Sequence, residues 1–517
     1  MNLRPAIVRP ILLLCLFAPC IAPGAFAQAD DRTGSGGRSM SWYREHAPFP
    51  MPVLTPPSFP ASIFSIADFG AIGDGQFLNT DAFGKAIAAC VAGGGGRVLV
   101  PPGLWLTGPI QLQSHVELHL ERGALVIFTK DRTQYPIIPA AEGHGFVVAS
   151  PVYGFNLTDM AITGEGVMDG GGESWRPVKK SKMTPAQWKG FVNSGGVVSS
   201  DGEVWWPSME AMNGEAYLKN LRKKNNGAPP TAGDLVQARD YLRPYMVYLV
   251  NCRNVLLQNV TLRNSPKYVV YPHGCRNLIM DHVNIFNEWW AQNGDGVDIS
   301  ACKDVILYRC NVSAGDDGIC MKSSDGGKPG DKNDAALENI LIAGCVVYHA
   351  HGGFVIGSNT DGGMHNIFVS DCSFAGTDVG LRFKSNMGRG GLVDNIFIQD
   401  ISMRDIATYA IVFDTYYENM PAGYVPDPNA PRPTDKTPEF RNFHISRIHC
   451  NGAQTAISIT GLPQMPVRDI HFDSVEITAE KGLVATQARG IDLHAVRLTT
   501  VAKPVMQVDA TAEVRVR

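Results

Sequence analysis

Acidic side chains gather in two short turns that a strand-like segment separates. The turn NGDGVD carries Asp295 and Asp298, and the turn GDD carries Asp316 and Asp317. Asp295 and Asp316 are 21 residues apart (316 − 295), about one turn of a β-solenoid. In such a fold the two turns would stack roughly 4.8 Å apart, the spacing of neighbouring strands. Carboxylates at such a short distance shift one another's pKa values, so one of them can stay protonated while the others ionise. Acid–base cleavage of a glycosidic bond requires this combination.

Other groups that could do chemistry follow at similar intervals. His351 comes 34 residues after Asp317 (351 − 317), and Arg382 comes 31 residues after His351 (382 − 351). Arg382 and Lys384 alternate along one strand-like segment, so both would point to the same side. Two exposed cations on that face would suit the carboxylates of acidic sugars, with Arg able to bind bidentately. The spacing therefore predicts an acid cluster, an imidazole and a cation pair along one face.

The elements that must hold these groups in place are short segments in which polar and apolar residues alternate. They begin at residues 115, 156, 254, 277, 304, 339, 366, 395, 442 and 469. Two-residue alternation and many β-branched residues indicate strands, and units that cannot bury their apolar faces alone must stack. We predict an all-β protein, a right-handed parallel β-helix of about ten coils. A β-propeller is the second candidate, but its blades need a more regular period.

Asn and Asp recur where these segments begin. Ladders of stacked amide side chains could satisfy one another there, so the NLT, NVT and NVS triplets at 156, 259 and 311 are interpreted as ladder positions rather than glycan sites. Residues 80–90 have helical periodicity and are predicted to form a short helix that caps the N-terminal end of the solenoid.

The ends and one interruption define the expected domain organisation. Residues 1–27 have the charge, apolar run and A-x-A site of a secretory signal peptide, so we expect a soluble, secreted or periplasmic bacterial protein. Residues 28–60 are polar and then Pro-rich and are expected to be a poorly ordered lead-in. Residues 61–517 would form a single β-helix domain, with a long insertion at about 171–243. The tryptophans and lysines of the insertion fit equally an active-site wall and a loop packed on the solenoid flank.

Composition restricts the partners and cofactors. Removing residues 1–27 takes away two arginines and no acid, so the net charge of −4 becomes −6, which argues against nucleic acid as a partner. Nine of the eleven cysteines remain, most of them in apolar segments, and are interpreted as buried core residues rather than a disulfide framework. Cysteine and histidine spacings typical of zinc sites are absent from the sequence, so we expect neither a metal nor another cofactor, and a monomer that does not bind a membrane.

Four short motifs, in order, resemble those of the polygalacturonase family of glycoside hydrolases, family 28. The family has Asn-Thr-Asp, Gly-Asp-Asp, Gly-His-Gly and Arg-Ile-Lys, and this chain has the corresponding tripeptides at 293–295, 315–317, 350–352 and 382–384. Gly294, Ala350 and Phe383 depart from the family pattern without removing a catalytic group. The likeness also covers DFGAIGDG, LTGPIQLQSHVELHLERGALV and VIGSN, and so spans most of residues 62–420.

The resemblance implies a right-handed parallel β-helix that hydrolyses galacturonan with inversion. It implies that Asp316 is the general acid, that Asp295 and Asp317 activate water, and that His351 tunes the acid. It further implies a set of substrate-binding or orienting residues, namely Arg382, Lys384, Asn293 and Tyr417, with Tyr416 as the alternative to Tyr417. Stacking alone suggests carboxylates about 5 Å apart, a separation that by the general rule favours retention, so inversion is implied by the resemblance only.

Several functions are compatible with these residues. The leading expectation is cleavage of α-1,4-galacturonosidic bonds in pectin, with exo-action favoured because a long insertion could block one end of a groove. The alternatives are a rhamnogalacturonan or xylogalacturonan hydrolase, a pectate lyase whose acidic cluster would hold Ca²⁺, and a non-catalytic carbohydrate-binding β-helix.

Overall fold

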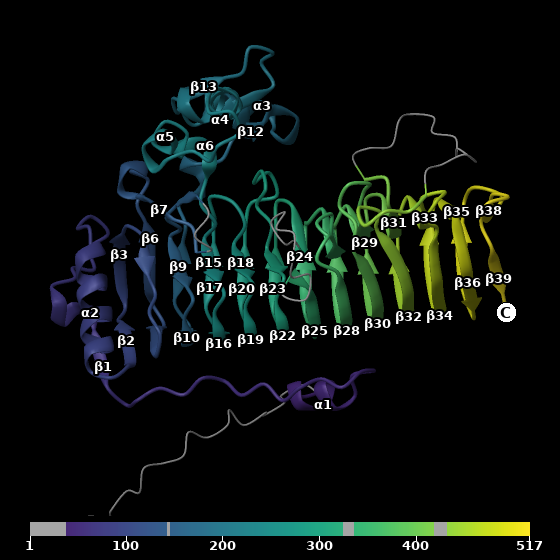
Figure 1. Ribbon diagram of the computed structural model, residues 1–517, viewed down its shortest axis with the longest axis horizontal. Coiled ribbons are helices and arrows are strands. Elements are labelled where there is room, and N and C mark those ends of the chain that lie inside the picture. The colour runs from purple at the N-terminus through teal and green to yellow at the C-terminus, as the bar shows by residue number, and fades with distance from the viewer. Residues whose placement is uncertain (1–37, 142–144, 324–334, 418–431) are drawn as a thin grey trace, which may run out of the picture.

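The fold is built from strands that wind into a parallel β-helix. The computed structural model describes residues 38–141, 145–323, 335–417 and 432–517, so the segment interpreted as a signal peptide lies outside the described residues. Two long parallel sheets run along the molecule, with the N-terminal coils at one end and the C-terminal coils at the other (Figure 1). The prediction of a right-handed parallel β-helix is confirmed.

The larger sheet has 22 strands among the described residues and contributes most of the coil circumference. Its strands are β1 (Ile63–Ser65), β2 (Gly96–Val100), β3 (Gly103–Thr107), β5 (Val116–Leu120), β6 (Ala124–Phe128), β10 (Thr158–Gly164), β11 (Val167–Asp169), β16 (Arg253–Gln258), β17 (Thr261–Arg263), β19 (Arg276–Asp281), β20 (Asn284–Phe286), β22 (Lys303–Tyr308), β23 (Asn311–Ser313), β25 (Leu337–Ala343), β26 (Val346–Tyr348), β28 (Met364–Ala375), β30 (Leu392–Arg404), β32 (Glu439–Asn451), β34 (Val467–Ala479), β36 (Ala488–His494), β37 (Arg497–Thr500) and β39 (Val514–Val516).

The smaller sheet has 12 strands in the described part of the chain, close to the expected ten coils. In spatial order they run from β4 at one end to β38 at the other, each strand beside that of the next coil. They are β4 (Ile110–Gln111), β9 (Val152–Phe155), β15 (Val247–Val250), β18 (Val270–His273), β21 (Val297–Ser300), β24 (Asp317–Lys322), β27 (Gly352–Ile356), β29 (Val379–Lys384), β31 (Tyr409–Asp414), β33 (Thr455–Thr460), β35 (Lys481–Thr486) and β38 (Met506–Val508).

Apolar side chains that point inward fill the helix from end to end. One continuous buried cluster extends from Ile66 to Leu493, and helix α2 (Thr80–Ala92) closes its N-terminal end with Phe83 and Ile87. The predicted capping helix is therefore present. The nine cysteines of the described residues are buried and free, and several thiols lie against backbone carbonyls of the preceding coil, as Cys275 does with Leu249. The core interpretation of the cysteines is confirmed.

A ladder of side-chain amides fixes one corner of the coils. Each member lies in the left-handed region, with φ between +51° and +60°, and an amide nitrogen donates to an oxygen of the preceding coil at about 3 Å in most steps. Left-handed backbone is unfavourable for most residues but tolerated by Asn and Asp, whose side chains bond locally. The ladder comprises Asp159, Asn254, Asn277, Asp304, Asn339, Asn366, Asn395 and Asn442.

This ladder predicts a stability difference between two variants of Asn339. Asn339 donates to Asp304 at 2.9 Å and accepts from Asn366 at 3.0 Å at a φ of +58°. Asn339→Ala loses both bonds and strains the backbone, which should lower the free energy of unfolding by about 2–3 kcal/mol. Asn339→Gly loses the same bonds without that strain and should be about 1 kcal/mol less damaging. Urea denaturation measures both, and equal losses would contradict the backbone argument.

Residues 38–60 correct one expectation, because they are not a poorly ordered lead-in. Helix α1 (Met40–Glu45) lies on the outer face of the larger sheet, below β22 to β28 in Figure 1, and the chain after it runs below the earlier coils towards β1. Their apolar side chains join a second buried cluster with residues of β22, β25 and β28; the residues of the segment buried there are Tyr43, Phe49 and Met51. Arg38 is also paired with Asp371 at 3.1 Å. The many prolines suggested an unstructured segment, but contacts with the sheet surface hold the segment in place.

The insertion at 171–243 folds into a small helical module. It contains β12 (Val178–Lys179), α3 (Pro185–Asn193), β13 (Val197–Val198), β14 (Val204–Trp206), α4 (Met209–Lys224), α5 (Ala232–Val236) and α6 (Arg239–Leu242), with 3-10 turns at Gly172–Ser174 and Lys180–Lys182. A two-stranded hairpin of β7 (Ile137–Pro139) and β8 (Phe146–Val148) lies beside it. In Figure 1 the module lies above β9 and β15, outside the coils. No helix in the described ranges is long and apolar enough to cross a membrane.

Candidate active site

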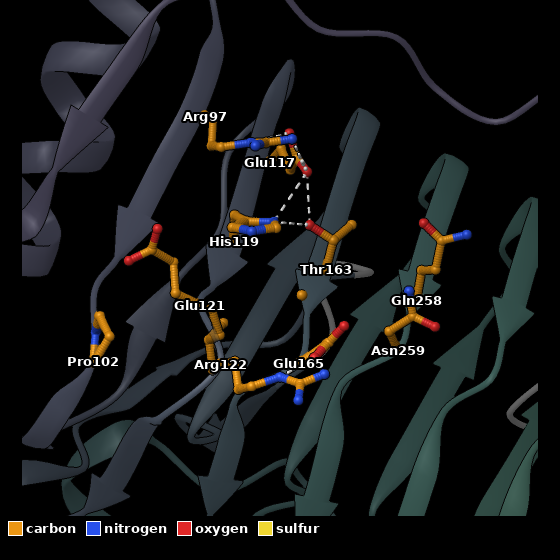
Figure 2. A pocket seen from close by; sticks show the side chains of 12 residues that line it. Arg97, Pro102, Glu117, His119, Glu121, Arg122, Thr163, Glu165, Gln258 and Asn259 are labelled. Atoms are coloured by element: carbon orange, nitrogen blue, oxygen red, sulfur yellow. Dashed lines mark hydrogen bonds and ion pairs between the residues drawn. The ribbon is translucent and has the colours of Figure 1, made fainter. Parts of the chain in front are cut away.

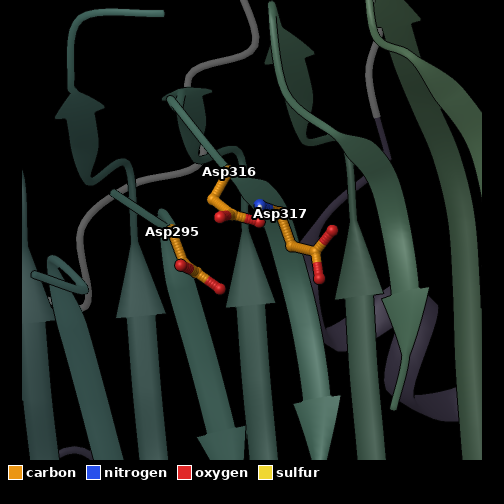
Figure 3. Close-up of side chains that lie close together, drawn as sticks. All are labelled: Asp295, Asp316 and Asp317. Atoms are coloured by element: carbon orange, nitrogen blue, oxygen red, sulfur yellow. Dashed lines mark hydrogen bonds between the residues drawn. The ribbon is translucent and has the colours of Figure 1, made fainter. Parts of the chain in front are cut away.

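The two acidic turns meet on the smaller sheet. Asp295 lies just before β21, Asp316 lies just before β24, and Asp317 begins β24, which pairs with β21. One carboxylate oxygen from each of the three residues lies within 4.8 Å of the others. Figure 3 shows the three side chains side by side at the ends of adjacent strands. The stacking that the 21-residue interval predicted thus produces the carboxylate cluster.

Cations hold one of these carboxylates ionised. Asp317 is buried, yet its two oxygens receive Lys384 Nζ at 2.7 Å and Arg382 Nη1 at 3.3 Å. Burial alone would raise its pKa, but the charges of Lys384, Arg382 and Lys322 outweigh burial and hold the pKa well below the usual value for Asp. These neighbours therefore favour the carboxylate form of Asp317.

Asp295 has the opposite environment. It is also buried, one of its oxygens has no hydrogen-bond partner, and Lys322 Nζ is no closer than 4.0 Å. Burial and the neighbouring charges of Asp298 and Asp316 raise the pKa of Asp295 well above its usual range, although Lys322 opposes the shift. Neighbouring environments thus push the pKa values of two carboxyl groups in one cluster far apart.

Asp316 lies between these two and is the most accessible of the three, with a side chain that is 20% exposed. Its Oδ1 accepts the backbone N–H of Asp317 at 3.0 Å and lies 3.2 Å from His351 Nδ1. The backbone N–H of His351 also donates to the carbonyl of Asp316 at 2.7 Å. His351 is therefore fixed beside Asp316 by both its backbone and its ring.

A cavity of about 290 Å³ opens beside this cluster, on the side of the later coils. His351, Arg382, Lys384 and Tyr417 are among the side chains that line it. The Tyr417 ring lies over both cations, with its centroid 4.9 Å from Lys384 Nζ and 5.4 Å from the Arg382 guanidinium carbon. The expectation that both cations are exposed is wrong for Lys384, which is only 6% exposed and pairs with Asp317. Sequence spacing places a cation on a face but does not reveal the partner that neutralises it.

Asn293 sits in the first acidic turn and is held from the insertion side. The Arg243 guanidinium donates to Asn293 Oδ1 at 2.8 Å and to the carbonyl of Gln292 at 2.8 Å. A Cβ at Gly294 would lie 2.7 Å from the Cβ of Ala291, so the threonine of the family pattern would not fit here without rearrangement. The departure at Gly294 is thus a packing consequence of a tight turn.

The insertion contributes a side chain to the site. Lys182, in the 3-10 turn Lys180–Lys182, has its Nζ 3.3 Å from His351 Nε2 and 3.5 Å from the carbonyl of Trp289. Other residues of the insertion make contacts away from the site: Trp175 is buried against Tyr135, which precedes the insertion, and Lys180 pairs with Glu203 within it. One lysine of the insertion thus reaches the site, whereas Lys180 does not.

A second cavity, of about 560 Å³, lies on the larger sheet near the N-terminal coils (Figure 2). Its buried acid, Glu117, accepts two bonds from Arg97 at 2.9 and 3.1 Å and one from Thr163 at 2.6 Å. Burial works to raise the pKa of Glu117, but hydrogen bonds from His119, Arg97 and Thr163 lower it to about 2. A carboxylate held ionised in this way cannot supply a proton, so Glu117 is unsuited to be a general acid.

Several residues at the site were missed by sequence reasoning. Lys322 lies 2.7 Å from Asp298, and Asp378 lies 3.7 Å from His351 Nε2. Lys182 and Arg243 come from the insertion. Lys322 ends the strand that Asp317 begins, and Asp298 lies in the first acidic turn. The alternation of side chains along these two neighbouring strands could therefore have predicted that Lys322 and Asp298 lie on the same side. Lys182 was among the lysines of the insertion that the sequence offered for an active-site wall, but its contact with His351 was not foreseen, and nothing in the sequence marked Arg243 or Asp378.

Comparison with known proteins agrees with this geometry. The sequence profile described as Glycosyl hydrolases family 28 matches residues 233–496. A probable polygalacturonase of Vitis vinifera is 26% identical over 80% of this chain and 74% of its own length. An exo-poly-alpha-D-galacturonosidase of Dickeya chrysanthemi is 26% identical over 77% of this chain and 64% of its own length.

Structural comparison points the same way. The crystal structure of a hyperthermoactive exopolygalacturonase from Thermotoga maritima superposes with a TM-score of 0.68 and 26% identity, covering 88% of this chain and 94% of that one. The family profile spans just over half of the chain, including all four motifs and both acidic turns. The chain therefore belongs to family 28 of the glycosyl hydrolases.

Proposed function

We propose that this glycosidase hydrolyses α-1,4-galacturonosidic bonds of pectic galacturonan. The proposal is based on two features of the site that lie next to each other. A carboxylate cluster with divergent pKa values adjoins a cavity lined by two cations and a tyrosine. The cluster supplies acid–base chemistry, and the cations supply contacts for sugar carboxylates. The relatives named as polygalacturonases support the same substrate class.

Asp316 is proposed as the general acid. It is the exposed member of the cluster, so the glycosidic oxygen can reach it, and its proton passes to that oxygen as the bond to the anomeric carbon breaks. His351, 3.2 Å from Oδ1, is placed to bond to the carboxylate that forms. Asn293 would keep the first acidic turn in register with this group.

Asp295 and Asp317 are proposed to orient and deprotonate the attacking water. Asp317 is ionised in the free protein because Lys384 and Arg382 neutralise it, and it accepts hydrogen bonds from water without first losing a proton. Asp295 adds a second oxygen that lacks a partner in the structure. In the reactive state the proton that burial favours on Asp295 in the free protein has passed to Asp316, so that Asp295 and Asp317 are both carboxylates and the water proton passes to this pair. Arg382, Lys384 and Tyr417 would contact the carboxylate and ring of the adjoining sugar.

Product analysis on defined galacturonate oligomers tests this function. We expect reducing ends to form from polygalacturonate, with monomers or dimers as the early products, because the insertion stands over one end of the site. A ladder of mid-length oligomers would overturn exo-action but leave hydrolysis in place. NMR of the first-formed anomer decides the stereochemistry: the family resemblance implies inversion, whereas the short carboxylate separation favours retention.

Two alternatives share the fold. A rhamnogalacturonan or xylogalacturonan hydrolase would use the same acids, and parallel assays on those polymers separate it. A pectate lyase would hold Ca²⁺ between the acids. The two oxygens of Asp317 are already paired with Lys384 and Arg382, which favours the hydrolase. Unsaturated, chelator-sensitive products would select the lyase.

The remaining features of the proposal concern location and assembly. We propose that residues 1–27 direct export to the periplasm or beyond, where pectic polymers occur, and that the remaining chain acts as one catalytic β-helix domain and as a monomer. Mass spectrometry of the protein secreted by its bacterial host tests cleavage after residue 27, and light scattering tests the monomer.

A further inference from the structure

Lys182 crosses from the insertion to the catalytic coils. Its Nζ contacts His351 Nε2 at 3.3 Å and the carbonyl of Trp289 at 3.5 Å, and these lie in two different loops beside Asp316. The lysine is partly buried, and burial lowers its pKa, although the charges of Asp316 and Asp378 oppose the shift. An ammonium group so placed can only donate hydrogen bonds, because it has three N–H groups and no acceptor.

That donor determines which ring nitrogen of His351 carries a proton. A nitrogen that accepts a hydrogen bond from an ammonium group must keep its lone pair free, so donation by Lys182 requires an unprotonated Nε2 and places the single ring proton on Nδ1. Nδ1 is the atom 3.2 Å from Asp316 Oδ1. Lys182, the ring and Asp316 therefore form one directional chain, in which Lys182 donates to Nε2 and Nδ1 donates to the carboxyl group.

We infer that Lys182 is a positioning residue that holds His351 as the neutral Nδ1–H tautomer, so that the ring donates to Asp316 when this acid gives up its proton. The inference rests on the proposed function, in which Asp316 is the acid. When the Asp316 proton passes to the leaving oxygen, the new carboxylate already has a donor facing it. The helical insertion thus completes the catalytic site as well as flanking it.

Kinetics of two substitutions provide the first test. Lys182→Met should lower kcat on polygalacturonate by about 10-fold, the loss of one charge-assisted hydrogen bond, and leave KM within about twofold. Lys182→Arg retains a donor and should recover much of the loss. Lys180→Met is the matched control from the same turn, since Lys180 pairs with the exposed Glu203 and not with His351, and its kcat should be unchanged.

A double-mutant cycle separates positioning from direct substrate binding. If Lys182 acts through His351, adding Lys182→Met to His351→Asn should cause no further loss. An equal loss in both backgrounds, or an effect on KM alone, would mean that Lys182 binds the substrate and would overturn the inference. Thermal melting of every variant confirms that it is folded.

Nitrogen-15 NMR of the histidine rings gives a readout that needs no activity. The wild-type His351 signal, assigned by its absence in His351→Asn, should show a protonated Nδ1 and a bare Nε2, and Lys182→Met should shift it towards the Nε2–H tautomer. A protonated Nε2 in the wild type, or a ring signal that Lys182→Met leaves unchanged, would refute the inference even if the enzyme is active. Conversely, a wild type that does not cleave polygalacturonate would refute the proposed function, and the NMR result would still decide the role of Lys182.

Discussion

Replacing Asp316 by Asn is expected to lower kcat on polygalacturonate by about 10²–10⁴-fold, the usual contribution of a positioned general acid. The amide has nearly the same shape but no proton to give to the leaving oxygen. Because Asp316 is partly exposed and lies at a strand end, the substitution should leave the melting temperature and KM close to those of the wild type. Initial rates of reducing-end formation, measured with circular dichroism on the same preparations, check both statements.

A matched substitution guards against a general effect of losing an aspartate. Asp304 begins the same coil on the other sheet and accepts from Asn339 in the ladder at 2.9 Å. Asp304→Asn retains an oxygen that can accept that bond, so its activity should equal that of the wild type. If Asp316→Asn is as active as Asp304→Asn, the catalytic assignment fails and the non-catalytic carbohydrate-binding alternative gains support.

The sequence was sufficient for those parts of the molecule that follow from local repetition. Alternating apolar residues predicted the stacked strands, and Asn and Asp at the starts of the repeats predicted the ladder that includes Asn339. The 21-residue interval predicted that Asp295 and Asp316 would meet. Each of these depends on one coil repeating the last, so spacing along the chain translates directly into position in space.

The features of the site that could not be predicted from the sequence depend on contacts that the repeat does not specify. Pairing of Lys384 with Asp317 brings together coils two turns apart, and Lys182 reaches His351 from a module outside the repeat. The segment after Arg38 looked like a linker because proline disfavours regular structure, yet Tyr43 and Phe49 find an apolar sheet surface. Long-range partners of this kind emerge only from the folded arrangement.

Asp295→Asn should abolish most activity and at the same time stabilise the protein at neutral pH. Burial raises the pKa of Asp295 well above its usual value, whereas the unfolded chain ionises it at about 3.9. Between those values the folded state retains a proton that the unfolded state releases, so stability falls as pH rises from about 4 through the folded pKa. Asn does not titrate, so the variant lacks this penalty.

The gain should therefore depend on pH. We expect the variant to be about 1–3 kcal/mol more stable than the wild type at pH 7.5, with the difference vanishing near pH 4. Calorimetric melting at both pH values measures it. Asp298→Asn is the contrasting variant: Asp298 lies 2.7 Å from the buried Lys322, and its loss leaves that ammonium group without its nearest counter-charge, which should destabilise the fold.

Opposite signs for two neighbouring aspartates would separate their roles. Asp298 would then be the structural counter-ion of Lys322, and Asp295 would be a group that the fold holds in an unfavourable environment. We expect a protein to retain such an unfavourable environment where function requires it, and here the oxygen of Asp295 that lacks a partner would bind the attacking water. If Asp295→Asn instead melts below the wild type at pH 7.5, Asp295 is ionised and stabilised by Lys322 at 4.0 Å, and the claim that the fold holds this group in an unfavourable environment is wrong.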